Sequence, residues 1–414
     1  MEHRAFGLIG IVLILLLAWI ASDNRKKIRL RTVGACFALQ VAIAVFVLYL
    51  PWGKDVLEFF AGKVTTLLSY ADAGIGFVFG NLDNRQTGFS FLVRVLPIII
   101  FFAALMEVLY HLRIMQIIVR WGGSAIRWLT DTRPVESLNV IANIFVGQTE
   151  APLSLKPYLP SISKPELFAI MVAGLASVSG TVLGGYIALG IEPKYLLAAC
   201  FMSAPAALLM AKMIMPDTVS ESKEEKKKTA KAVYAMAETG PRHPNVIMAA
   251  AVGAQNGLKL AVAIGAMLIA FIALIALCNG LLGWAGGWFG HNDLTLQNIL
   301  GWIFSPVMWA VGIPWSEAQL AGGIFGEKVI LNEFIAFGSL VEAESSLSPK
   351  SVVVLSFALC GFANISSIAI LLGGLGTLIP DRMPDIARMG VKAVFAASLA
   401  NLMSAALAGI LVGL

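Results

Sequence analysis

Long runs of apolar residues recur along most of the chain and are separated by short polar segments. An apolar run of about 20 residues can cross the hydrocarbon core of a bilayer as an α-helix. We therefore predict an all-α polytopic membrane protein with eight transmembrane helices. The predicted spans are residues 5–22, 30–51, 91–112, 164–190, 194–214, 246–282, 350–378 and 386–413.

Two further apolar regions, 134–160 and 299–345, carry Pro, Gly and charged residues in their middles. A helix interrupted in this way is not stable against lipid, because broken backbone leaves N–H and C=O groups unpaired. We predict that both regions are re-entrant helical hairpins whose tips are buried in protein. The stretches 54–82 and 114–130 are predicted to be helices that lie along the membrane interface.

The order of these elements repeats. Each hairpin precedes a long apolar helix that is itself interrupted by small and polar residues, at 164–190 and again at 350–378. Two predicted spans lie between these two helices, so the helices should cross the bilayer in opposite directions. Inverted repeats with interruptions at matching positions are typical of secondary transporters, whose substrates bind near the middle of the membrane.

Composition supports a membrane protein. Of the 414 residues, 58% are hydrophobic and 13% are charged, and the mean hydropathy is +0.83. A soluble domain carries about 25% charged residues, so soluble enzymes and nucleic-acid-binding proteins are excluded. The four cysteines lie in apolar stretches without CxxC spacing, so we expect neither a disulfide framework nor a metal site built from cysteine.

The positions of Lys and Arg predict the orientation. The segment DNRKKIRLR (23–31) follows the first apolar run, and the segments 216–245 and 380–392 are also rich in Lys and Arg. The positive-inside rule places all three in the cytoplasm, which leaves both termini outside a bacterial inner (plasma) membrane. The N-terminal run is therefore expected to be a retained span and not a cleaved signal peptide.

Several charged residues outside the hairpins are given a structural interpretation. The segment 216–245, with its ESKEEKKKTAKA run, is expected to be a solvated linker. Lys212, near an inner helix end, is expected to extend to the lipid headgroups. Glu107 sits deeper in its span and is expected to pair with a basic residue of the 114–130 helix.

Three segments resemble the signature segments of the concentrative nucleoside transporter family. They are GQTEAP (147–152), NEF (332–334) and CGFANISSIAILLGGLG (360–376), and the resemblance extends from about residue 7 to the end. It implies a homotrimer in which each protomer has a scaffold domain and a transport domain. The expected divisions are 1–112 scaffold, 113–215 first transport repeat, 216–245 linker, 246–290 scaffold helix and 291–414 second transport repeat.

The first hairpin is expected to contact the nucleoside base. A nucleoside of the uridine or adenosine class is neutral, so its site needs few charges and several placed hydrogen-bond groups. The resemblance implies that Gln148, Thr149 and Glu150 face the base. For Gln148 and Thr149 the alternative is capping of helix ends at the hairpin tip.

The second hairpin and its following helix are expected to hold the ribose. A carboxylate inside the membrane is costly enough that a functional role is the default for Glu333. The resemblance implies that Glu333, Asn364 and Ser367 bind the ribose hydroxyls. Asn364 and Ser367 are three residues apart and should share one face of a helical turn; the alternative is interhelical hydrogen bonding. The apolar residues implied to line the base side are Val182, Leu260 and Phe362.

The expected coupling ion is Na⁺. In the sodium-coupled members that the chain resembles, neutral oxygens at an unwound helix turn hold the ion. The resemblance implies side-chain oxygens from Asn143 and Ser177 and backbone carbonyls from Val146 and Val178. Proton-coupled relatives depart from this pattern of Asn, QTEAP and Ser, so proton coupling is the less favoured alternative.

A membrane-embedded hydrolase is the competing class of function. It would use Glu150 and Glu333 as acid and base. The sequence contains no nucleophile elbow, HExxH motif or phosphate-binding glycine loop that would support hydrolysis. We therefore expect a transporter and not an enzyme.

Overall fold

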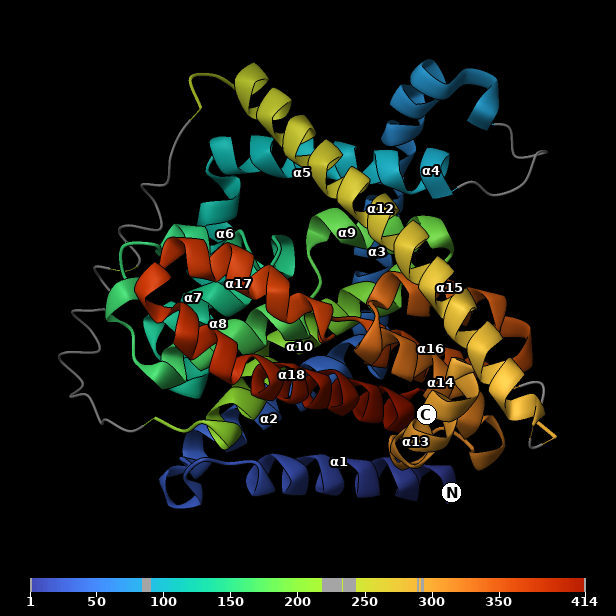
Figure 1. Ribbon diagram of the computed structural model, residues 1–414. Helices are drawn as coiled ribbons and strands as arrows, with labels where there is room; N and C mark the ends of the chain where they lie inside the picture. Colours follow the sequence, from blue (N-terminus) through green and yellow to red (C-terminus); the bar gives the residue numbers. More distant parts are fainter. Residues whose placement is uncertain are drawn as a thin grey trace.

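A computed structural model describes residues 2–83, 91–217, 233, 243–288, 290, 291 and 294–412. Within these ranges the chain forms helices and no β-strand, which confirms the all-α prediction (Figure 1). Six of the described helical segments are long and apolar enough to cross a membrane, or seven if one bent pair is counted as a span. The six are Leu30–Leu48, Phe91–His111, Lys164–Leu189, Pro193–Ile214, Val246–Gly287 and Pro380–Leu411, and each overlaps a predicted span.

The N-terminal part of the chain contains helices that pack around the repeats. The elements are α1 (Glu2–Ile20), η1 (Arg25–Lys27), α2 (Leu30–Leu48), α3 (Pro51–Phe79), η2 (Gly80–Asp83), α4 (Phe91–Arg94), α5 (Leu96–His111) and α6 (Ile114–Thr130). Helix α6 is amphipathic, because Val119 and Ile126 are buried while Trp121 and Trp128 on its other side are exposed. This amphipathic pattern is typical of a helix at the membrane interface, which is the position predicted for 114–130.

The first hairpin has one α-helical arm. Helix α7 (Pro134–Phe145) descends to the tip, and the returning arm consists of the short 3₁₀ turns η4 (Ala151–Leu155) and η5 (Leu159–Ser161). Pro152, Pro157 and Pro160 explain this difference from the predicted helical hairpin, because proline removes a backbone donor and interrupts an α-helix. Helices α8 (Lys164–Ala176) and α9 (Gly180–Leu189) follow, broken at 177–179, and α10 (Pro193–Ile214) completes the repeat.

The second predicted hairpin, 299–345, consists of three helices. They are α13 (Leu296–Ala310), α14 (Trp315–Ile330) and α15 (Glu333–Glu342), with α13 and α14 bent by 118°. The prediction merged two breaks: one at Gly312, whose φ of +106° suits glycine, and one at Leu331 and Asn332. By element order α14 and α15 correspond to the first hairpin, and α13 corresponds to α6.

The second repeat ends in another broken helix and the C-terminal helix. These elements are η6 (Glu344–Ser346), α16 (Pro349–Leu359), α17 (Ser366–Leu378), η7 (Pro380–Arg382) and α18 (Met383–Leu411). The predicted span 350–378 is therefore two helices separated by residues 360–365. The two breaks lie against each other, because the Phe362 amide donates to the Ser177 carbonyl oxygen at 3.2 Å.

Helix α12 (Val246–Gly287) crosses the molecule diagonally and packs on α5 (Figure 1). Its 42 residues extend about 63 Å, twice the roughly 30 Å hydrocarbon core, so it must tilt or project beyond that core. Gly253 and Gly257 let it approach α5 closely: a Cβ on either would lie 2.7 Å from α5 backbone. The close contact fixes the position of α12 beside the two breaks.

Helices α1 and α18 lie antiparallel. A Cβ on Gly7 would lie 2.5 Å from Ile410, near the C-terminal end of α18, while Asp23, after α1, pairs with Lys392. The described ends of the chain therefore lie on the same side of this helix pair, as Figure 1 shows. An even number of membrane crossings would likewise place both ends of the chain on one side of the membrane.

Most of the linker predicted at 216–245 lies in segments 218–232 and 234–242, outside the described residues. The described residues of the linker are 216, 217, 233 and 243–245, and the last of these directly precedes α12.

Candidate functional site

A cavity of about 300 Å³ lies where the two hairpin tips, the two helix breaks and α12 meet. This volume falls at the lower end of the roughly 300–1,000 Å³ typical of small-molecule sites. Its lining includes all nine residues that the sequence implied for substrate contact. They are Gln148, Thr149, Glu150, Val182, Leu260, Glu333, Phe362, Asn364 and Ser367.

Glu333 is the buried carboxylate of this cavity. It is the first residue of α15, where the helix dipole favours a negative charge. Its Oε1 accepts a hydrogen bond from the Tyr186 hydroxyl at 2.9 Å, and its Oε2 accepts one from Asn364 Nδ2 at 3.2 Å. Each carboxylate oxygen has two lone pairs, so the oriented carboxylate retains capacity to accept from two further donors.

Asn364 lies in the break before α17 and not on a helical turn with Ser367. Its Oδ1 accepts from the Ser367 backbone amide at 2.8 Å and from the Ser366 hydroxyl at 2.7 Å. This side chain thus caps the start of α17 while its Nδ2 binds Glu333. Asn364 thus lies just outside the helix and not within it, although it and Ser367 both line the cavity.

The tip of the first hairpin seats against two glycines. A Cβ on Gly174 in α8 would lie 2.7 Å from the Gln148 Cβ, and one on Gly374 in α17 would lie 2.7 Å from Thr149 Cγ2. Gln148 is buried, and its Oε1 has no hydrogen-bond partner among the described residues. That oxygen does not cap a helix end, so it is available to a donor in the cavity.

The apolar part of the lining comes from three separate elements. Val182 lies in α9, Leu260 in α12 and Phe362 in the break between α16 and α17. Since α12 belongs to a different part of the chain from either repeat, the cavity is complete only when α12 packs across the two breaks. An apolar wall facing polar hairpin tips is suited to a flat ring with polar edges.

The four residues expected to hold a cation are all buried, and none of them lines the cavity. Val146 follows α7, while Ser177 and Val178 lie in the break after α8. These segments lie close together, because a Cβ on Gly180 would lie 2.8 Å from the Phe145 carbonyl oxygen. The ends of two helices therefore converge immediately behind the hairpin tip, with their carbonyl ends carrying partial negative charge.

Asn143 carries an unsatisfied oxygen at this point. Its Nδ2 donates to the Asn139 carbonyl at 2.8 Å, but its Oδ1 is fully buried and has no partner among the described residues. A buried acceptor without a donor costs about 1–3 kcal/mol, so such atoms call for a specific explanation. The Ser177 hydroxyl donates to the Ala173 carbonyl at 2.9 Å, which leaves the Ser177 oxygen free to coordinate a cation.

Models of three protein families match consecutive parts of the chain. "Na+ dependent nucleoside transporter N-terminus" matches residues 9–82, "Nucleoside recognition" matches 92–193, and "Na+ dependent nucleoside transporter C-terminus" matches 195–409. The chain belongs to the Na⁺-dependent nucleoside transporter family. The resemblance identified from GQTEAP, NEF and CGFAN is thereby confirmed.

Relatives and solved structures agree. The chain is 44% identical to the nucleoside permease NupC of Helicobacter pylori, with 99% of this chain and 98% of that protein covered. It is 48% identical to the uncharacterized transporter YutK of Bacillus subtilis, over 98% and 99%. The structure of CNTnw in an inward-facing substrate-bound state aligns with a TM-score of 0.93 at 45% identity, over 99% of this chain and 98% of that one.

Membership of this family decides between the two classes of function. The family and its named relatives are transporters and permeases. The chain is therefore a nucleoside transporter and not a membrane hydrolase, as the absence of hydrolase motifs from the sequence led us to expect. Glu150 and Glu333 are accordingly not needed as the acid and base of a hydrolysis reaction.

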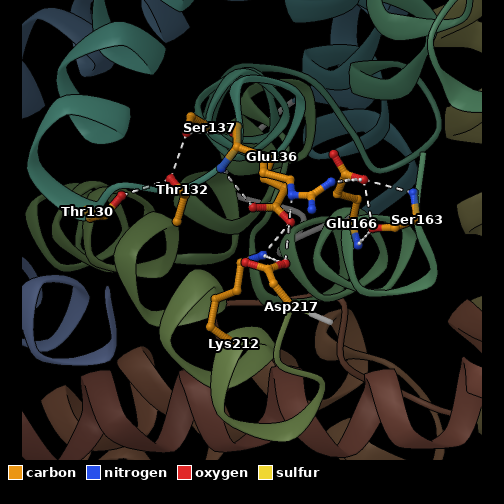
Figure 2. Close-up of polar contacts among 9 residues, drawn as sticks. Thr130, Thr132, Glu136, Ser137, Ser163, Glu166, Lys212 and Asp217 are labelled. Atoms are coloured by element: carbon orange, nitrogen blue, oxygen red, sulfur yellow. Dashed lines mark hydrogen bonds and ion pairs between the residues drawn. The ribbon is translucent and has the colours of Figure 1, made fainter. Parts of the chain in front are cut away.

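A second polar cluster holds the base of the first hairpin in this transporter (Figure 2). The Lys212 ammonium of α10 binds Glu136 Oε1 at 2.5 Å and Asp217 Oδ1 at 2.7 Å, while Arg133 binds Glu166 at 2.9 Å. Lys212 is only 4% exposed. The expectation that Lys212 reaches the headgroups is therefore wrong. Its ammonium instead binds buried carboxylates of α7 and of the linker that follows α10.

A chain of hydroxyls extends the same cluster. Thr130 Oγ1 lies 2.8 Å from Thr132 Oγ1, which lies 2.8 Å from the Ser137 hydroxyl (Figure 2). At the other side, Ser163 caps α8 and its hydroxyl donates to Glu166 at 2.7 Å. The cluster thus joins the end of α6, both ends of the first hairpin and α10 by buried hydrogen bonds.

Glu107 pairs with a different partner from the one expected. Its Oε1 lies 2.7 Å from His243 Nε2, at the end of the linker, and not against a basic residue of α6. The two residues are 136 positions apart in the sequence, so no local pattern could predict this contact.

The sequence also missed three side chains behind the cavity. Tyr186 orients Glu333, and Asn401 of α18 donates to the carbonyl oxygens of Ala176 at 2.7 Å and Cys360 at 3.0 Å, one at each helix break. Lys328 donates to the Asn401 Oδ1 at 2.9 Å. A buried Lys in an apolar run was the available signal, since such a residue needs a partner inside the membrane.

Proposed function

We propose that this transporter is a secondary active symporter that takes nucleosides into the cell and is driven by a Na⁺ gradient. The observation that supports this proposal most strongly is that all nine expected substrate residues line one cavity. The unsatisfied Asn143 oxygen lies directly behind the hairpin tip that forms one wall of that cavity. The cavity offers a site for the nucleoside, and the unsatisfied oxygen offers one for the ion.

The substrate would be held from two sides. Gln148, Thr149 and Glu150 would bind the base edge, and the Gln148 Oε1 is an available acceptor for a base N–H. Glu333 would accept hydrogen bonds from two ribose hydroxyls while Tyr186 and Asn364 keep its carboxylate in place. Charge-assisted bonds of this kind are roughly twice as strong as neutral ones, so we expect them to contribute most to ribose affinity.

The donor set behind the hairpin tip fits Na⁺. The Asn143 and Ser177 side-chain oxygens and the Val146 and Val178 carbonyls would hold the ion, and a carboxylate is not needed at the negative ends of two helices. When bound, Na⁺ supplies a single positive charge that satisfies these oxygens. Because Asn143 lies on the arm that leads to Gln148, fixing its oxygen positions the base-binding tip, so ion and substrate should tighten each other's binding equally.

The same proposal covers assembly and orientation. We propose a homotrimer in a bacterial inner membrane with both termini outside. The paired α5 and α12 would belong to the scaffold, and the two repeats, 113–215 and 291–414, would form the transport domain in opposite orientations. The antiparallel α1 and α18, with the described chain ends on one side, support an even number of crossings.

Uptake into sealed vesicles tests the proposal. Purified protein in proteoliposomes should accumulate labelled uridine, adenosine or thymidine when a sodium gradient is imposed in the absence of a pH gradient. Accumulation that follows an imposed pH gradient in sodium-free buffer would instead establish proton coupling. Equilibration without accumulation under either gradient would contradict symport.

A further inference from the structure

Lys328 is a fully buried lysine near the end of α14, outside the set of residues used for substrate or sodium. Its ammonium donates to Asn401 Oδ1 at 2.9 Å and to the Ala358 carbonyl oxygen at 3.3 Å, and it lies 5.5 Å from the Phe325 ring centroid. The Ala358 carbonyl belongs to the last turn of α16. The Lys328 amino group therefore lies at the carbonyl end of the helix that precedes the second break, where the helix dipole favours a positive charge.

The two repeats place Lys328 and Asn143 at the same position. Asn143 is three residues before Val146, the C-cap residue of α7, and Lys328 is three residues before Leu331, the C-cap residue of α14. From each of these C-cap residues to the serine that caps the first half of the broken helix, Ser163 of α8 or Ser348 of α16, the spacing is the same 17 residues. The stretch that follows each of the two positions therefore has the same length in both repeats.

The surroundings of the two positions also match, except that a lysine of the second repeat takes the place of an asparagine in the first. In the first repeat an amide oxygen, Asn143 Oδ1, is buried without a donor beside the break after α8. In the second repeat an amide oxygen, Asn401 Oδ1, is buried beside the break after α16 and accepts from the Lys328 ammonium. The first repeat thus has a buried amide oxygen without a donor, and the second has one that accepts from a lysine of the chain itself.

We propose that the Lys328 ammonium is a tethered cation that performs in the second repeat the positioning role that Na⁺ performs in the first. This inference rests on the proposed Na⁺-coupled function. A primary ammonium and Na⁺ each carry one positive charge and can each bind several neutral oxygens at a helix end. The second repeat therefore needs no ion from solution, and Lys328 is a positioning residue that restricts coupling to the first repeat.

Hydrogen bonds link the two positions to each other and to the substrate site. Asn401 accepts from Lys328 and donates to the Ala176 carbonyl, next to the proposed ion ligand Ser177. Lys328 also interacts electrostatically with Glu333, five residues further along the chain and across the break. Neutralising Lys328 should thus disturb the ribose carboxylate and the sodium site together.

Two substitutions distinguish the loss of the Lys328 charge from the opening of space for an ion at that position. Lys328→Met keeps much of the side-chain length and removes the charge, whereas Lys328→Asn introduces the residue found at the equivalent position of the first repeat and leaves room for an ion. The measurement is uridine affinity by calorimetry on purified protein at several sodium concentrations, with choline as the replacement cation. Size-exclusion chromatography and thermal unfolding establish that each variant is folded.

We expect wild-type affinity to rise with sodium with a log–log slope of about one, as for one linked ion. Lys328→Met should bind uridine roughly 5- to 150-fold more weakly at every sodium concentration, because buried acceptors lose their donor. Lys328→Asn should be equally weak at low sodium but recover at high sodium with a slope of about two. A merely structural lysine would not change the slope.

Wild-type affinity in Lys328→Met, or a slope of about one in folded Lys328→Asn, would overturn the inference. Sodium-independent uridine binding by the wild type would instead overturn the proposed Na⁺ coupling, and the affinity of Lys328→Met would still test the role of Lys328. If neither variant folds, the reciprocal variant Asn143→Lys tests the inference instead. It should bind uridine in choline with no dependence on sodium, and folded protein that still requires sodium or binds no uridine would overturn the inference.

Discussion

Asn364 Nδ2 donates to Glu333 Oε2 at 3.2 Å, which joins the break before α17 to the first residue of α15 across 31 residues of sequence. Because the Asn364 Oδ1 also caps α17, this amide fixes the carboxylate relative to a helix end. Tyr186, from the first repeat, holds the other carboxylate oxygen. The proposed ribose site is thus assembled by both repeats, which explains why its geometry should be sensitive to their relative position.

Replacing Glu333 by Gln should abolish concentrative uptake without unfolding the protein. A neutral amide cannot accept charge-assisted bonds from two ribose hydroxyls, and the loss should be about 1.5–3 kcal/mol, or roughly 10–150-fold in apparent affinity. Uptake kinetics in proteoliposomes measure this, with 2′-deoxy and 3′-deoxy nucleosides to identify the partner hydroxyls.

Glu344→Gln is the matched control for Glu333→Gln. Glu344 is an exposed glutamate of the short helix that follows α15, away from the lining of the cavity. Its substitution should leave uptake unchanged. Unaltered affinity in a folded Glu333→Gln protein would remove Glu333 from the substrate site.

Replacing Asn143 or Ser177 by Ala should weaken sodium dependence and substrate affinity together. Each substitution removes a proposed ion ligand, and thermodynamic linkage requires that a loss of coupling appear equally for ion and substrate. Uridine affinity as a function of sodium concentration is the measurement. The control is Ser356→Ala, because Ser356 is buried in α16 and donates to a backbone carbonyl at 2.8 Å, as Ser177 does, but lies away from the break. An Asn143→Ala protein with normal sodium dependence would contradict the site.

Replacing Lys212 by Met should destabilise the protein, because it leaves the buried carboxyl of Glu136 without its partner (Figure 2). Breaking such a buried pair from one side costs about 3–5 kcal/mol, whereas replacing both partners is often neutral or stabilising. The thermal unfolding temperature in detergent should therefore fall for Lys212→Met and recover in the Lys212→Met, Glu136→Leu double variant. Additive losses in the double variant would show that the ion pair does not hold the hairpin base.

Single cysteines should report the orientation. In a protein lacking the exposed Cys278, a cysteine at the exposed position 244 or 388 should react with an impermeant maleimide only from the cytoplasmic side, and one at the C-terminus only from outside. The physical reason is the positive-inside distribution of Lys and Arg around positions 244 and 388. Reaction of all three from the same side would contradict the proposed topology and, with it, the inverted repeat.

Local sequence was sufficient for the class of fold and for the residues that line the cavity. Apolar runs of bilayer length predict helices regardless of what packs on them, and six such runs are helices long enough to span a membrane. The segments GQTEAP, NEF and CGFAN pointed to the family, and their residues do line one cavity. These features can be recognised in the sequence alone because they depend on composition and on short motifs.

Helix breaks were harder to place from sequence. The run 299–345 was predicted as one hairpin, but Gly312 and Asn332 mark separate breaks and three helices result. Asn364 was placed on a helical turn although it caps one from outside. Both errors have one cause: a polar or glycine residue in an apolar run shows that a break is near, but the backbone hydrogen bonds that decide its position are made with distant segments.

Partner choice was decided by the tertiary structure alone. The sequence showed that Lys212, Glu107 and Lys328 are charged and lie in apolar surroundings, but it could not show that they bind Glu136, His243 and Asn401. A buried charge is stabilised by whichever group folding brings within about 3–4 Å, and that distance is unrelated to separation along the chain. The amino-acid sequence by itself determined which charged residues lie in apolar segments, and the tertiary packing determined which partner each one has.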